Sequence, residues 1–153
     1  MGKITVVDIV LRLLGAVIVG FAVGAQRART SHPAGIRTHI LVALGSCVVM
    51  VTSCIMYEQT IAVFGTTPSD PARLGAQVIN GIGFLGAGTI LVTGRQQVKG
   101  LTTAAGLWAS ACTGLAVGAG FYECVLIAFA MIFLSIRLFP IVDAYIQENC
   151  LLY

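Results

Sequence analysis

The sequence predicts an all-α integral membrane bundle of five transmembrane helices. Its 153 residues are 58% hydrophobic and only 10% charged, whereas soluble domains carry about 25% charged residues. Five apolar runs approach the roughly 20 residues that a helix needs to cross a hydrocarbon core. Small residues also recur at helical spacing within these runs. A soluble chain of this length could not bury so much apolar surface.

The five runs define a transmembrane domain over residues 1–139, followed by a short tail over residues 140–153. The expected spans cover approximately residues 6–25, 38–57, 73–92, 101–120 and 122–139. The first span contains Asp8 and Arg12 in its opening turns, and the second contains no charged residue. Almost nothing joins the last two spans, which predicts a tight hairpin around Gly118 and Gly120.

Positive charge predicts the orientation, because cytoplasmic loops retain Lys and Arg. One side of the bundle has Arg27, Arg29, Arg37, Arg95, Lys99 and Arg137, and the other has Lys3 and Arg73. The N-terminus is therefore expected outside and the C-terminus in the cytoplasm. The surroundings of such a chain are the lipid bilayer, and no nucleic-acid partner is expected.

The run from Gly81 to Gly86 matches the G-x-G-x-x-G pattern of dinucleotide-binding turns. Such a turn needs a preceding strand and an acidic residue about 20 positions later. Asp70 and Pro71 instead open a helix before these glycines, and no acid occurs between Asp70 and Glu123. The glycines therefore belong to a membrane helix, and no cofactor is predicted.

Small residues let helix backbones approach closely in lipid, where the hydrophobic effect cannot drive helices together. The ridge Ala16, Gly20 and Gly24 in the first span is expected to be a buried contact and a natural dimer seam. The third span has glycines around its axis, which predicts a place at the bundle centre. The expected helix-packing glycines are Gly20, Gly24, Gly81, Gly83, Gly86, Gly88, Gly106, Gly114 and Gly118.

A polar stripe follows the third span, where Arg73, Gln77 and Asn80 are spaced i, i+4 and i+7. The stripe is either a hydrated ion path or a set of interhelical hydrogen bonds worth about 0.6–2 kcal/mol each. A Mg²⁺ ion, as ligand or substrate, would require a carboxylate among its ligands. Asp70, about one helical turn before Arg73, could supply this carboxylate. His39 and the other histidine match no zinc pattern, so no metal site is predicted.

Polar residues are also expected at the cytoplasmic ends of the spans. Thr102 or Thr103 is expected to cap the fourth span. An arginine costs about 2.5–3.5 kcal/mol at the centre of a membrane helix on insertion scales, so Arg37 is expected at the interface. The full set of interface candidates is Arg27, Arg37, Thr38, Thr102 and Thr103. No paired-carboxylate or Ser-His-Asp arrangement is found, so enzyme activity is not expected.

Two segments carry a family resemblance. "GFAVGAQRARTSHPAGIRTHILVALGS" and "DPARLGAQVINGIGFLGAGTILVTGRQQVKGLTTAAGLWASACTGLAVGAG" resemble the membrane domain of the MgtC/SapB family, over roughly residues 15–120. The resemblance implies a multi-pass bacterial inner-membrane protein, linked to growth or virulence at low magnesium. It also implies a regulatory role, with the ATP synthase as one partner.

Two departures limit that resemblance. Gln26 stands where the family usually has an acid. Larger members also carry a soluble C-terminal domain, and this sequence ends at Tyr153 as a short form. Three functions stay open: a binding or regulatory protein that is at least a dimer, a Mg²⁺ or other cation transporter that uses the third span, and a structural scaffold.

Overall fold

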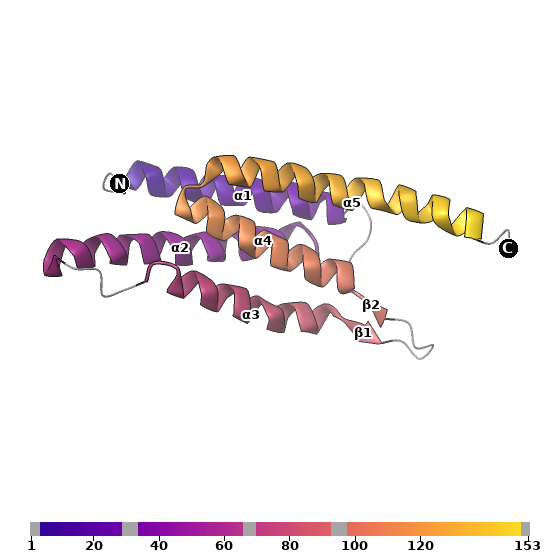
Figure 1. Ribbon diagram of the computed structural model, residues 1–153, viewed down its shortest axis with the longest axis horizontal. Coiled ribbons are helices and arrows are strands. Elements are labelled where there is room, and N and C mark those ends of the chain that lie inside the picture. The colour runs from indigo at the N-terminus through magenta and orange to yellow at the C-terminus, as the bar shows by residue number, and fades with distance from the viewer. Residues whose placement is uncertain (1–3, 29–33, 66–69, 93–97, 151–153) are drawn as a thin grey trace.

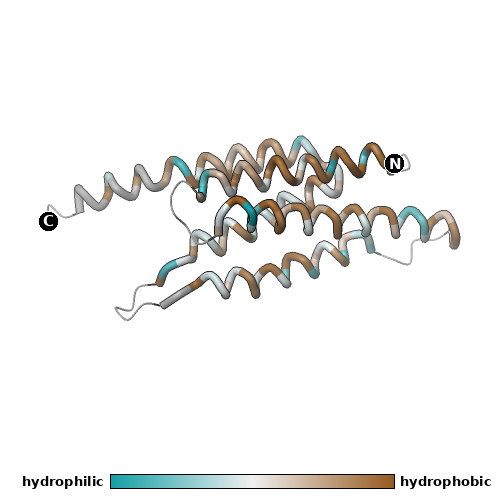
Figure 2. Tube along the Cα trace, turned by 180° about the vertical axis from the view of Figure 1, so that it is seen from behind, coloured by the Kyte–Doolittle hydropathy of each residue, from teal (hydrophilic) through white to brown (hydrophobic). Residues whose placement is uncertain are grey.

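The computed structural model describes residues 4–28, 34–65, 70–92 and 98–150, which form five helices and one pair of short strands (Figure 1). The helices are α1 (Val6–Ala28), α2 (Ile36–Phe64), α3 (Arg73–Thr89), α4 (Leu101–Ala119) and α5 (Tyr122–Cys150). They lie alongside one another in an elongated bundle (Figure 1), and hydrophobic residues occur along much of each helix (Figure 2). The structure therefore has the all-α architecture of a membrane bundle.

Four of the described helices are long and apolar enough to cross a membrane: α1, α2, α4 and the Tyr122–Phe139 part of α5. The remaining helix, α3, has 17 residues and is about 25 Å long at 1.5 Å per residue. The expected tail is not a separate segment, because α5 continues to Cys150.

The end of the expected third span is wrong, because α3 stops at Thr89. Strand β1 (Leu91–Val92) follows and pairs antiparallel with β2 (Val98–Lys99). Apolar and β-branched residues such as those of this segment favour extended backbone. The chain then enters α4 through Gly100, whose φ of 98° is in the left-handed region that favours glycine.

The central helix is α4, so the expected central place of α3 is wrong. Helix α4 packs against α1, α2, α3 and α5, whereas the main contacts of α3 are with α2 and α4. Helix α3 lies at one margin of the bundle (Figure 1). A Cβ atom built on Gly81, Gly83 or Gly88 would meet no atom within 4 Å. These glycines of α3 therefore face outward within one chain.

The small-residue ridges of α1 and α4 both pack against α2. A Cβ atom on Gly20 would lie 2.7 Å from Ile40 Cα. Farther along α2, a Cβ atom on Gly114 would overlap the carbonyl group of Ala43, and one on Gly118 would lie 2.7 Å from the carbonyl oxygen of Cys47. The expected dimer seam along Ala16, Gly20 and Gly24 is therefore wrong, because contacts within the chain already cover it.

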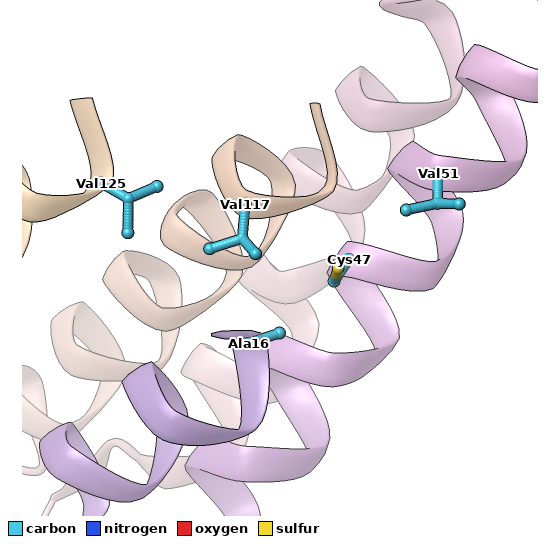
Figure 3. Packing of buried hydrophobic residues seen from close by; sticks show 5 residues of the cluster. All are labelled: Ala16, Cys47, Val51, Val117 and Val125. Atoms are coloured by element: carbon cyan, nitrogen blue, oxygen red, sulfur yellow. The ribbon is translucent and has the colours of Figure 1, made fainter. Parts of the chain in front are cut away.

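A hydrophobic core joins four helices at the end of the bundle that holds the α4–α5 turn. Figure 3 shows its five buried members, which are Ala16, Cys47, Val51, Val117 and Val125. They come from α1, α2, α4 and α5. Because small and β-branched residues fill this space, the four backbones approach closely enough for van der Waals packing, the main attraction between helices in lipid.

An arginine of α1 closes the same end of the bundle. Arg12 Nη1 donates a 2.7 Å hydrogen bond to the carbonyl oxygen of Gly118 near the C-terminus of α4. Gly120 follows with a φ of 86° and begins the expected tight turn into α5. The last carbonyl groups of a helix carry partial negative charge, so this guanidinium has a favourable position although it lies within a predicted span.

Candidate functional site

Four polar side chains meet inside the bundle, at the opposite end from Arg12. Arg27 of α1 is 2% exposed, and His39 of α2, Thr103 and Ser110 of α4 are 0% exposed. Arg27 Nη2 donates a 2.9 Å hydrogen bond to Thr103 Oγ1, and His39 Nδ1 shares a 2.9 Å hydrogen bond with Ser110 Oγ. We call these four residues the inner cluster. It connects three helices through polar contacts.

Gly106 makes room for the inner cluster, since it lies on α4 between the two hydrogen-bonded residues of that helix. A Cβ atom built on Gly106 would lie 3.4 Å from His39 Cε1 and 3.9 Å from Arg27 Nε. A second glycine, Gly24, brings α1 close to the first turn of α2, where its Cβ would lie 2.6 Å from Ile36 Cα. Small residues thus place an arginine and a histidine beside each other in the interior.

The capping role expected of Thr102 or Thr103 is wrong. Gly100 occupies the N-cap position of α4 and provides no side-chain hydrogen bond. Thr103 points inward to Arg27, and Thr102 is exposed. Arg27 is correspondingly buried in the bundle instead of lying at its surface. Intramembrane hydrogen bonds of this kind connect helices and restrict their relative movement.

A serine and a histidine in contact also occur in hydrolases, where the histidine activates the serine hydroxyl. That chemistry requires a substrate to reach the hydroxyl group. Both His39 and Ser110 are 0% exposed, and the helices around them leave no opening at the Ser110 oxygen. The pair therefore provides an interhelical contact between α2 and α4, and the inner cluster as a whole has a structural character.

The polar stripe of α3 lies on the opposite side of that helix from its packing face. The packing face contains Gly75, Ile82 and Gly86, all of which are buried. The opposite face has four exposed side chains at positions i, i+4, i+7 and i+11. We call this set the outer stripe; its members are Arg73, Gln77, Asn80 and Phe84.

Phe84 gives the outer stripe an aromatic member. Its side chain is 85% exposed, the largest value among the exposed large hydrophobic residues of the described chain. Two amide side chains and one guanidinium precede it on the same face. Polar groups that meet hydrocarbon without a hydrogen-bond partner cost several kcal/mol. The outer stripe therefore presents hydrogen-bonding groups and one aromatic ring on the outward face of α3.

Asp70 does not join the outer stripe through a side-chain contact. Its Oδ1 atom accepts a 2.8 Å hydrogen bond from the Ala72 N–H group, and its carbonyl oxygen accepts one from the Arg73 N–H group at 3.2 Å. The carboxylate thus closes the turn before α3. The expected opening of the helix at Asp70 and Pro71 is wrong, because Ala72 is the N-cap residue of α3 and has no side-chain cap hydrogen bond. Within the described residues, no three His, Cys, Asp or Glu side chains gather in a group that could hold a metal ion.

The remaining interface candidates lie apart from both sets. Arg37 and Thr38 are exposed in the first turn of α2. The structure thus brings Arg27 and Thr103 together, and it places the other candidates on separate surfaces.

Three residues with structural importance were not among the candidates for polar contacts. His39 was predicted only not to be a zinc ligand and Arg12 only to be a charge within a span, and Ser110 was given no polar role. An ionisable residue inside a membrane segment is by itself a sign of a specific interaction. That rule would have identified both His39 and Arg12 from the sequence.

The comparison with family models gives one assignment: the MgtC family model matches residues 13–145. This chain belongs to the MgtC family. The matched range includes the inner cluster, the outer stripe, all of α2, α3 and α4, and most of α1 and α5. No solved structure matches the chain.

Three curated relatives illustrate the MgtC-family likeness. An uncharacterized protein of Haemophilus influenzae is 43% identical over 90% of this chain and 58% of its own length. A protein of Escherichia coli K12 named "Putative magnesium transporter YhiD" is 37% identical over 86% of this chain and 60% of its own length. Protein SapB of Bacillus subtilis is 38% identical over 87% of this chain and 57% of its own length. The chain thus spans little more than half the length of these relatives.

Proposed function

We propose that this MgtC-family membrane protein acts in magnesium homeostasis by binding and regulating another membrane protein. One observation carries the proposal, namely that the outer stripe faces away from α2 and α4. A helix of a second membrane protein would cover this face. Its donors and acceptors would satisfy Gln77 and Asn80, and Phe84 would provide an apolar anchor.

The glycines beside the outer stripe support this kind of contact. Gly81 and Gly88 are exposed, and no atom lies within 4 Å of a Cβ built on either. Small residues permit close approach of a second helix, and here no helix of the same chain uses them. The surface therefore combines a shallow backbone with hydrogen-bonding groups, which suits a helical partner in lipid.

We further propose that α3 is the fifth spanning segment. Gly75 lies against Leu115 near the end of α4, and Gly86 lies against Ala104 near its beginning. Helix α3 thus runs antiparallel to α4 over much of its length, which supports a crossing at the same depth. The distribution of Lys and Arg supports an N-terminus outside and a C-terminus in the cytoplasm. Together with the membership of the MgtC family, it supports the inner membrane of a bacterium as the proposed location.

The magnesium link is proposed from family membership and from the name of the E. coli relative. An indirect link, through a regulated partner, is favoured because the Asp70 carboxylate already accepts a hydrogen bond from Ala72 N–H in the turn before α3. The family resemblance makes the ATP synthase the first partner to test. We propose no catalytic role, because the buried Ser110 hydroxyl is out of reach of a substrate.

A cation path is the second candidate, and the continuity of the outer stripe favours it. Such a path requires two copies of the chain, because one copy leaves Gln77 and Asn80 on its outer surface. Two stripes facing each other across a dimer would line the path. The two candidates differ in what covers α3: a different protein or a second copy.

Photocross-linking in the membrane tests the proposal. A photoreactive amino acid at Asn80 is expected to form an adduct with a different membrane polypeptide in cells grown at low magnesium, identified by mass spectrometry. The matched control is the same amino acid at Ile127, which is exposed on α5 outside the stripe. An adduct of twice the chain mass at Asn80 would favour the cation path. Equal adducts at both positions, or none at Asn80, would overturn the partner surface.

A further inference from the structure

A groove separates α2 from α3 on the side of α3 next to its packing face. Its volume is about 410 Å³, within the roughly 300–1,000 Å³ typical of ligand sites. The residues that line it are Arg37, Thr38, Leu41, Val42, Gly45, Ser46, Ile82 and Leu85. The groove is open to the surroundings of the bundle. It contains no member of the inner cluster or the outer stripe.

The interior of the groove suits hydrocarbon. Leu41, Val42, Ile82 and Leu85 provide apolar walls. The one hydroxyl group deep in the groove, that of Ser46, already donates a 2.7 Å hydrogen bond to a carbonyl oxygen of its own helix. An occupant of the interior therefore meets no polar group in need of a partner, and apolar contact is what the walls offer.

One end of the groove has the opposite character. Arg37 and Thr38 are exposed there, in the first turn of α2. The N-cap of this helix is Gly35, which has no side-chain oxygen to accept a hydrogen bond from the first N–H groups. A helix N-terminus carries partial positive charge and readily binds phosphate. The guanidinium and the helix end thus give this mouth a positive charge that complements an anion.

We propose that the groove between α2 and α3 binds one anionic phospholipid. The lipid phosphate contacts Arg37, the Thr38 hydroxyl and the first turn of α2, while one acyl chain lies along Leu41, Ile82 and Leu85. Charge complementarity at the mouth and apolar walls beyond it match the two ends of this amphiphile. The inference needs only the placement of the chain in a membrane, and it does not depend on a partner at the outer stripe.

Gly45 provides a variant that fills the groove without disturbing the fold. A Cβ atom on Gly45 would meet no atom within 4 Å, although the residue lines the groove. Gly45→Leu therefore places a side chain in the lipid position. Gly83→Leu is the matched control, because it is also an open, exposed helical glycine but lies outside the groove. Arg37→Gln removes the charge, and Arg137→Gln, in exposed α5, is its control.

Native mass spectrometry of the delipidated full chain tests the proposal, with phosphatidylglycerol and phosphatidylcholine of identical acyl chains as probes. We expect one bound phosphatidylglycerol, at least tenfold favoured over phosphatidylcholine. Arg37→Gln should remove that preference, and Gly45→Leu should remove the adduct. The two control variants should bind as the unchanged protein does.

Three results would overturn the lipid site. Binding of phosphatidylglycerol by Gly45→Leu equal to that of the unchanged protein would place the lipid elsewhere. An equal loss of preference in Arg37→Gln and Arg137→Gln would indicate a nonspecific charge effect. A dimer mass that disappears in Gly45→Leu would assign the groove to a second copy of the chain. Thermal unfolding midpoints of all variants in detergent show that each is folded before its binding is compared.

Discussion

The inner cluster and the outer stripe contain similar side chains but meet opposite surroundings. Each set has one arginine and other residues that form hydrogen bonds. Each set also lies on, or next to, a helix that is rich in glycine. In the inner cluster, glycines bring three helices together around Arg27 and His39. Along the outer stripe, the glycines contact nothing within the chain, and Asn80 is exposed. The inner cluster and the outer stripe therefore differ in the backbone contacts that nearby glycines make. The spacing of polar residues along one helix does not distinguish them.

The largest effect on stability is expected from a substitution that breaks the helix contact supporting the inner cluster. Gly114→Val places side-chain atoms against the Ala43 carbonyl group, so α2 and α4 must separate. We expect the free energy of unfolding to fall by about 3 kcal/mol or more, at the upper end of overpacking effects. Unfolding of the purified protein in mixed detergent, followed by Trp108 fluorescence, measures the change. Gly83→Val should cost far less, and equal losses would contradict the assignment of inner and outer glycines.

The next largest effect on stability is expected from loss of the hydrogen bond between Arg27 and Thr103. Thr103→Val keeps the shape of the side chain and removes one acceptor from a buried guanidinium. We expect a loss of about 1.5–3 kcal/mol in the free energy of unfolding, typical of hydrogen bonds to charged groups. The adjacent Thr102→Val is the control, because Thr102 is exposed. A similar effect of both variants in the same unfolding measurement would show that the inner contact carries no special stability.

Ser110→Ala should have a smaller effect. It removes the partner of His39 Nδ1 in a contact between α2 and α4. Interhelical hydrogen bonds in membranes contribute about 0.6–2 kcal/mol, and we expect a loss in that range. A double-mutant cycle with His39→Ala measures the coupling between the two side chains. Additive losses would show that the two residues stabilise the bundle independently.

The smallest effect on folding is expected at the outer stripe. Asn80→Leu changes a side chain that is exposed within one chain, so the free energy of unfolding should change by no more than about 0.5 kcal/mol. The same substitution should nevertheless reduce cross-linking of α3 to its partner several-fold, when the photoreactive group is placed at Phe84. A large loss of stability would instead place Asn80 in a contact inside the bundle.

Much of the architecture follows from hydropathy and small-residue spacing. These patterns predict the helices, the turn at Gly120 and the close contacts of Gly20 and Gly114, because apolar length and small side chains act locally along each helix. The inner cluster could not be predicted in the same way. Arg27 and Thr103 are 76 residues apart in the sequence, and spacing along one helix does not say which other helix a side chain meets.

The position of α3 was the main error, and its cause is physical. Glycines around the whole helix are compatible with burial on every side, but they also permit an exposed helix whose partner lies on another chain. Only the contacts of Gly75 and Gly86 decide which face packs. The outward direction of Gln77 and Asn80 follows from those two contacts and from the helical period.

Mg²⁺ entry into liposomes that contain the purified chain alone tests the central claim most directly. An entrapped indicator reports the rate, with protein-free liposomes and an ionophore as the two reference conditions. If the outer stripe of α3 is a surface for a different membrane protein, the rate will not exceed that of protein-free liposomes. Mg²⁺ entry that Asn80→Leu abolishes and Thr102→Val leaves intact would contradict this claim and assign the stripe to a cation path.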